Sequence, residues 1–154
     1  MKRTNIPLLA LAGAFVACAA LILTWAFYGN MVSTSLSASL TLWIMALVCL
    51  ILAWRIKDRK ESGRIGMDSS QLSPLQAAQF LIIGKASAWT GSLVGGAYFG
   101  MALYVLPRIA DLSAAAEDAP GVIASTLGGI ALCFSGLYLE RNCETPPPTD
   151  GEYA

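Results

Sequence analysis

The sequence contains no histidine, and only 13% of its residues are charged. Without histidine it has no imidazole to serve as a general base or as a metal ligand. Its four cysteines are isolated, so no Cys-x-x-Cys spacing indicates a zinc site or a redox pair. It also has no Walker loop and no Gly-x-Ser-x-Gly elbow. These absences predict a protein that is not an enzyme, with no catalytic residues, no bound metal and no cofactor.

Apolar runs fill most of the chain, at residues 6–28, 36–54, 87–106 and 120–139. A helix rises 1.5 Å per residue, so roughly 20 apolar residues cross a hydrocarbon core about 30 Å thick. The runs are continuously apolar rather than alternating, which argues against the strands of a barrel. The composition agrees, because 56% of the residues are hydrophobic. The predicted fold class is all-α, an integral membrane bundle of four transmembrane helices in two antiparallel hairpins.

Lysine and arginine indicate the orientation, because they are enriched in short cytoplasmic loops. Most of the ten basic residues precede the first run, follow the second or follow the fourth. Residues 29–35 carry no charge, and residues 108–119 carry Arg108 together with three acidic residues. We therefore expect both termini in the cytoplasm and a cytoplasmic loop at residues 55–72.

The first run also has features of a signal peptide, since Lys2 and Arg3 precede an apolar stretch. Residues 15–18 are similar to a weak lipoprotein cleavage box. Residues 19–27, however, stay apolar after Cys18, and the run is longer than the core of a signal peptide. The sequence favours an uncleaved membrane anchor.

The third helix is expected to be longer than the bilayer requires. Ser73, Pro74 and Gln76 form a helix start, and no further breaker occurs before Pro107. A helix of that length measures roughly 50 Å, so residues 75–84 are predicted to extend into the cytoplasm. The proline-rich and acidic residues 143–154 are predicted to be a disordered cytoplasmic tail. Residues 1–142 then form the four-helix transmembrane domain.

Small residues recur at every fourth position of the third run, and the fourth run has a similar row. In lipid, such rows let two helix backbones approach closely. The favoured interpretation is packing between the third and fourth helices, and the alternative is a face that receives a partner subunit or a lipid. The candidate helix-packing or partner face consists of Ala88, Ser92, Gly96, Gly100, Gly91 and Gly95 in the third run, with Gly121, Ser125 and Gly129 in the fourth.

Lys85 and Glu140 are the candidate polar pair. Counting along the third helix from Pro107, and along the fourth from Pro120, places both residues near the inner boundary of the membrane. This spacing predicts an ion pair at the inner interface. The alternative is that Lys85 extends alone to lipid phosphate, which costs little free energy at a helix end.

Three segments resemble a known family: IGKASA at residues 83–88, LYVLPR at 103–108 and LYLERNC at 137–143. Together they resemble a group of actinobacterial four-span membrane proteins of unknown function (domain of unknown function 3180). The resemblance is strongest over residues 80–143, and the first two runs match only in being apolar. It implies four spans and a bacterial plasma membrane, and it carries over no activity and no site.

Three function classes are compatible with this pattern. The favoured hypothesis is a non-catalytic accessory or scaffold subunit, which binds a membrane-protein partner through its small-residue helix face. The alternative is an oligomeric transporter or binding protein for a small molecule or lipid, although no ionisable residue is expected deeper than Lys85. An enzyme acting on lipid ranks third. The expected partners are membrane lipids and another membrane protein or a homo-oligomer, and no nucleic acid.

Overall fold

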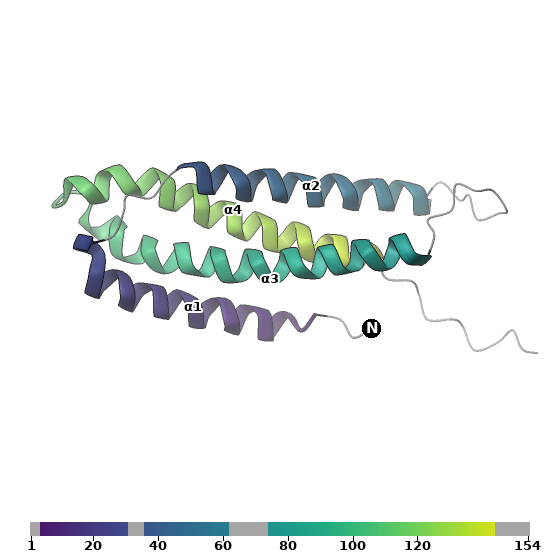
Figure 1. Cartoon of the computed structure of the whole chain (residues 1–154), viewed down its shortest axis with the longest axis horizontal. Helices are drawn as coiled ribbons and strands as arrows, with labels where there is room; N and C mark the ends of the chain where they lie inside the picture. Colours follow the sequence, from purple (N-terminus) through teal and green to yellow (C-terminus); the bar gives the residue numbers. More distant parts are fainter. Residues whose placement is uncertain (1–3, 31–35, 62–73, 144–154) are drawn as a thin grey trace, which may run out of the picture.

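The computed structural model describes residues 4–30, 36–61 and 74–143. This part of the chain is all-helical, and its four long helices run alternately in opposite directions (Figure 1). Thr4 and Cys143 lie at one end, called here the terminal end, and two short 3-10 helices lie at the other, called the η end. The elements are α1 (Ile6–Phe27), η1 (Tyr28–Asn30), α2 (Leu36–Glu61), α3 (Pro74–Val105), η2 (Leu106–Arg108) and α4 (Ser113–Cys143).

Three of the helices are long and apolar enough to cross a membrane: α1, residues Ser37–Asp58 of α2, and α4. Their lengths of 22, 22 and 31 residues correspond to about 33 Å or more of helix. Over the described residues α3 is not among them. Its glycine, serine and tyrosine residues lower its hydropathy, and the glycines and serines also let it pack closely between α1 and α4. The described residues therefore contain three helices suited to span a bilayer, which is consistent with a membrane protein.

The helices form an open row rather than a closed bundle. In spatial order they are α1, α3, α4 and α2, and each packs mainly on its neighbours in this row (Figure 1). Within the described helices, α1 contacts neither α2 nor α4. The first two helices, predicted to be a hairpin, therefore do not pack on each other. They lie on opposite sides of the hairpin formed by α3 and α4.

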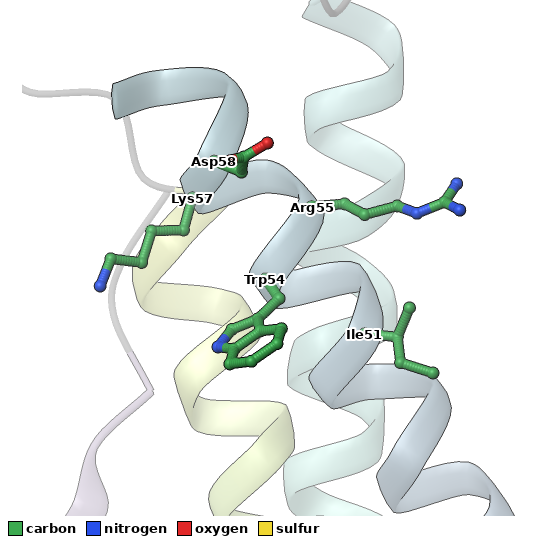
Figure 2. Close-up of a pocket in the computed structure, with 5 residues that line it drawn as sticks. All are labelled: Ile51, Trp54, Arg55, Lys57 and Asp58. Carbon is green, nitrogen blue, oxygen red and sulfur yellow. The ribbon is translucent and has the colours of Figure 1, made fainter. Parts of the chain in front are cut away.

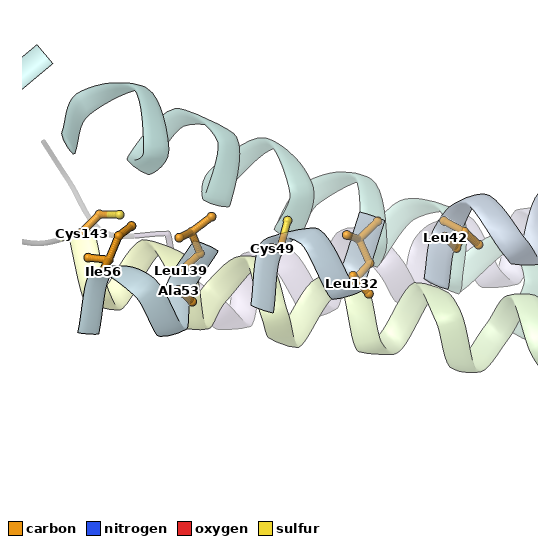
Figure 3. Packing of buried hydrophobic residues seen from close by; sticks show 8 residues of the cluster. Leu42, Cys49, Ala53, Ile56, Leu132, Leu139 and Cys143 are labelled. Carbon is orange, nitrogen blue, oxygen red and sulfur yellow. The ribbon is translucent and has the colours of Figure 1, made fainter. Parts of the chain in front are cut away.

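The α2–α4 contact is formed by ordinary side chains. In α2 the buried residues Leu42, Ala46, Cys49, Ala53 and Ile56 are spaced alternately four and three apart. They pack against buried α4 residues, as Figure 3 shows. This spacing is that of a left-handed coiled-coil seam. Those α4 residues are Leu132, Leu139 and Cys143.

Two helix boundaries differ from the expected spans. The second helix continues to Glu61, because its charged end contains good helix formers and needs no apolar surroundings outside a bilayer. The fourth helix begins at Ser113, and Pro120 lies inside it. Asp118 therefore lies buried within α4 rather than in the loop between the third and fourth apolar runs.

The third helix begins at Pro74, where the sequence placed a helix start. With 32 residues it is about 48 Å long, longer than a hydrocarbon core. The proposed cap at Ser73 and the tail after Cys143 lie outside the described residues. The extension of α3 into the cytoplasm remains a prediction.

Candidate functional site

One row of small residues in α3 packs against α1. A Cβ added to Gly96 would meet the carbonyl of Gly13, and one added to Gly100 would meet the carbonyl of Ala17. One turn earlier, Ser92 donates a hydrogen bond from Oγ to the carbonyl oxygen of Leu9, at 2.8 Å. The two backbones are thus nearly in contact along several turns.

A second row in α3 packs against α4. A Cβ added to Gly91 would lie 2.8 Å from the carbonyl oxygen of Gly129, and one added to Gly95 would lie 3.1 Å from the Gly129 carbonyl carbon. A Cβ added to Gly136 would lie 3.0 Å from the Cα of Ala88. Any side chain larger than hydrogen at these glycines would push α3 and α4 apart.

The predicted small-residue face is therefore divided between two neighbours within the chain. Ser92, Gly96 and Gly100 face α1, whereas Ala88, Gly91 and Gly95 face α4. In α4, Gly129 belongs to the contact with α3. Gly121 and Ser125 are buried, and the Ser125 hydroxyl is fully buried with no hydrogen-bond partner in the structure. In this conformation both rows contribute to packing between helices of the same chain.

An apolar groove remains between α1 and α4. Because these helices flank α3 without contacting each other, they leave a hollow of about 430 Å³ whose lining is almost wholly apolar. Backbone of Gly95 and Gly96 forms part of its floor. Its walls are Gly13, Ala14, Ala17, Cys18 and Leu21 of α1, Phe99 and Leu103 of α3, and Ile130 of α4.

A buried carboxylate lies at the terminal end. Glu140 is only 4% exposed, and its Oε1 accepts hydrogen bonds from both the backbone nitrogen and the Oγ1 of Thr4, each 2.9 Å long. Its Oε2 is buried and has no hydrogen-bond partner among the residues that the structure describes. These bonds tie the residue preceding the cap of α1 to the end of α4, two helices that otherwise do not touch.

Lys85 and Glu140, the predicted polar pair, lie on adjacent turns of the packed helices α3 and α4. A Cβ on Gly84, next to Lys85, would be 2.9 Å from the Glu140 backbone nitrogen. The Lys85 side chain is exposed, and the hydrogen bonds seen at Glu140 come from Thr4. The ion pair itself stays a prediction. No local sequence signal indicated Thr4, because 136 positions separate it from Glu140.

An aromatic and charged cluster forms at the η end. The Tyr28 hydroxyl donates a hydrogen bond to Oδ2 of Asp118, at 3.2 Å. The Tyr28 and Tyr104 rings lie 5.1 Å apart between centroids, and the Arg108 guanidinium stands 3.9 Å from the Tyr104 centroid. This Tyr-Arg cluster (Tyr28, Tyr104, Arg108 and Asp118) joins η1, α3, η2 and α4. The spacing of four between Tyr104 and Arg108 is the sequence signal of this contact.

Burial, and after it the charge of Asp118 and the hydrogen bond to it, raises the pKa of the Tyr28 phenol above its ordinary value of 10.0. The phenol is therefore protonated at physiological pH and can donate to the carboxylate. A raised pKa means that this contribution to stability is fully present below about pH 10 and is lost as the pH rises through the raised value.

The basic end of α2 borders a hollow of about 530 Å³, lined by Ile51, Trp54, Arg55, Lys57 and Asp58. Figure 2 shows Arg55 and Lys57 extending to opposite sides of the helix. Their charges therefore do not converge on one point. Within the described ranges, no group of three or more histidine, cysteine, aspartate or glutamate residues is placed to hold a metal ion.

Comparison with known proteins gives one match. Residues 9–147 match the family described as "Protein of unknown function (DUF3180)". No curated protein and no solved structure matches the chain. The matched region takes in all of α3 and α4, both small-residue rows, the Tyr-Arg cluster and Glu140. The chain therefore belongs to the DUF3180 family.

Proposed function

We propose that the protein is a four-span integral protein of the bacterial plasma membrane and acts as a non-catalytic accessory subunit of a larger membrane protein. The fourth span is α3. It packs along α1 on one side and along α4 on the other, so it crosses any membrane that these two helices cross. Only its first turns, before the level of Glu140, extend beyond the bilayer.

The proposed orientation places the terminal end in the cytoplasm. Arg55 and Lys57 lie near that end of α2, and Arg141 lies near that end of α4. Arg108 is the basic residue of the η end within the described ranges. Positive residues are retained on the cytoplasmic side, so both termini belong there.

The apolar groove between α1 and α4 is the observation that carries the accessory role. Glycine backbone in its floor lets another helix backbone approach closely, and in lipid this close packing is the main source of helix association. A single helix of a partner would lie against α1, α3 and α4 together. The open row would then become a closed bundle.

A lipid-binding or transport role is the alternative, because the same apolar groove also has room for an acyl chain. In that case the protein would assemble with further copies of itself and carry lipid or a small molecule in the groove. The two roles differ in what copurifies: a second polypeptide at fixed stoichiometry, or lipid alone.

The test is a pull-down of the tagged full-length chain from native membranes in mild detergent, followed by native mass spectrometry. Ala14→Phe fills the groove from α1 without touching the α1–α3 contact. Ala26→Phe is the matched control, since Ala26 is exposed on α1 and does not line the groove. Substitution of Gly96 is unsuitable, because it would separate α3 from α1.

We expect wild type and Ala26→Phe to retain a partner polypeptide at fixed stoichiometry, and Ala14→Phe to lose it. Equal recovery of that polypeptide by both variants would exclude the groove as its binding site. Recovery of a homo-oligomer that carries lipid, displaced by Ala14→Phe, would establish the alternative.

A further inference from the structure

The Tyr-Arg cluster presents a fixed positive charge at the η end. The Arg108 guanidinium lies over the face of Tyr104, and Tyr104 is in turn supported by Tyr28. Tyr28 is held by its hydrogen bond to Asp118, a carboxylate only 9% exposed. Asp118 thus positions Tyr28, Tyr28 supports Tyr104, and Tyr104 positions the Arg108 cation.

No carboxylate among the described residues forms a salt bridge or hydrogen bond with Arg108. Asp118 instead accepts a hydrogen bond from Tyr28, and Asp111 and Glu117 are exposed. Residues 31–35, which follow η1 in the sequence, contain no acidic side chain. The guanidinium carbon lies 3.9 Å from the Tyr104 ring centroid, and a cation–π contact does not consume all five N–H donors of an arginine, so donors remain for a ligand.

The surroundings of Arg108 indicate the depth at which a ligand would lie. Leu106, Ile109 and Leu112 are 43%, 40% and 39% exposed, so large apolar side chains flank the arginine in this turn. A mixture of exposed apolar side chains with partly buried tyrosine and arginine at a helix end is typical of the membrane–water interface. Lipid phosphate groups lie at that level.

We propose that Arg108, positioned by Tyr104, is a binding site for a phosphate group. A planar guanidinium with free edge N–H groups can form two parallel hydrogen bonds to phosphate oxygens. The source of the phosphate is either a lipid headgroup or a free phosphate ion. This site shares no residue with the groove. The phosphate-binding proposal can therefore be tested independently of the accessory role.

The test measures the affinity of the purified full-length protein in an uncharged detergent for two probes, short-chain phosphatidylglycerol and inorganic phosphate. Arg108→Gln should raise the dissociation constant at least tenfold, because it removes both the charge and the paired donors. Arg108→Lys should recover part of the affinity. Tyr104→Phe keeps the ring and should bind as wild type does, whereas Tyr104→Leu should weaken binding severalfold.

Arg141→Gln is the matched control, since Arg141 is an exposed arginine of α4 at the opposite end. Arg108→Gln is compared with it only after both show the same helical circular dichroism. Response to phosphatidylglycerol alone supports a lipid headgroup, and response to inorganic phosphate supports a free anion. Equal affinities for Arg108→Gln and Arg141→Gln, or no binding of either probe by wild type, would overturn the proposal.

Discussion

A methyl group added to Gly91 would meet the backbone nitrogen and Cα of Cys133 and the carbonyl oxygen of Gly129. Backbone atoms cannot rotate away as the end of a side chain can, so α3 and α4 would have to separate. The same holds at Gly129, where an added Cβ would meet the backbone of Gly95. Lipid supplies no hydrophobic force between helices, so the close approach of these backbones is itself what holds α3 to α4.

Gly91→Ala should therefore destabilise the protein by about 1–3 kcal/mol, the usual cost of overpacking a tight contact. Gly29→Ala is the matched control, because a Cβ at Gly29 in η1 would meet nothing within 4 Å. Unfolding by sodium dodecyl sulfate in mixed micelles, followed by circular dichroism, measures both variants. If Gly91→Ala unfolds at the same detergent fraction as Gly29→Ala, the α3–α4 contact in solution is looser than the structure shows.

At the scale of whole helices, two kinds of contact join the row. α3 packs on α1 and α4 through glycine, alanine and serine. In contrast, α2 packs on α4 through a seam in which Leu139 is fully buried. The seam is therefore the place where removal of a side chain, rather than addition of one, weakens the fold.

Leu139→Ala should cost about 2 kcal/mol, at the low end for a buried leucine, because surrounding lipid is as apolar as the interior and only packing is lost. Leu127→Ala on the same helix is the control, since Leu127 is 52% exposed and keeps lipid around it after truncation. Its expected cost is below about 0.5 kcal/mol. If the two variants unfolded at the same detergent fraction in mixed micelles, the packing of α2 on α4 would not depend on Leu139.

The sequence was sufficient to locate the helices and insufficient to pair them. Apolar length and the Pro74 start predicted α1 and the first turn of α3 closely. Pairing was not predictable, because lipid-facing and buried residues of α1 are equally apolar and leave no periodicity to detect. Adjacency in the chain suggested an α1–α2 hairpin, whereas Gly13 and Ala17 of α1 instead pack against Gly96 and Gly100 of α3. Those small residues of α1, spaced four apart, were the missed signal.

Like the fold, the candidate sites were predictable from the sequence only in part. The small-residue rows were visible from spacing alone, and their division between α1 and α4 was not. Glu140 was identified by depth, but its partner Thr4 lies at the far end of the chain. The link from Tyr28 to Asp118 spans 90 positions and likewise has no local signal. Contacts between distant segments depend on which helices become neighbours, and the apolar pattern does not determine that.

At the scale of the whole molecule, α3 is the helix that links the other three helices of the open row. It joins α1 to α4, and α2 also contacts it where the Cys49 thiol donates to Ser87 Oγ at 3.3 Å. A helix so placed need not be strongly apolar, because its neighbours shield much of it from lipid. The four-span proposal therefore rests on the packing of α3 between α1 and α4 rather than on its hydropathy.

Accessibility of single cysteines tests the four spans and the orientation together. In a variant whose native cysteines are replaced by alanine, Gly29→Cys and Ile109→Cys place exposed thiols at the η end, and Lys57→Cys and Gln79→Cys place them toward the terminal end. A membrane-impermeant maleimide should label the first two in intact cells. It should label the other two only after the membrane is permeabilised, because the proposed orientation, argued from the positive residues, places that end in the cytoplasm.

Ile109 and Gln79 are the deciding pair, because they lie near opposite ends of α3. Labelling of both from the same side would mean that α3 does not cross the membrane, and would leave a three-span protein. Reversal of the whole pattern would retain four spans and invert the orientation, placing Arg108 and its proposed phosphate in the cytoplasm. Opposite accessibility of the two positions is expected, because α3 can follow α1 and α4 along their length only by crossing with them.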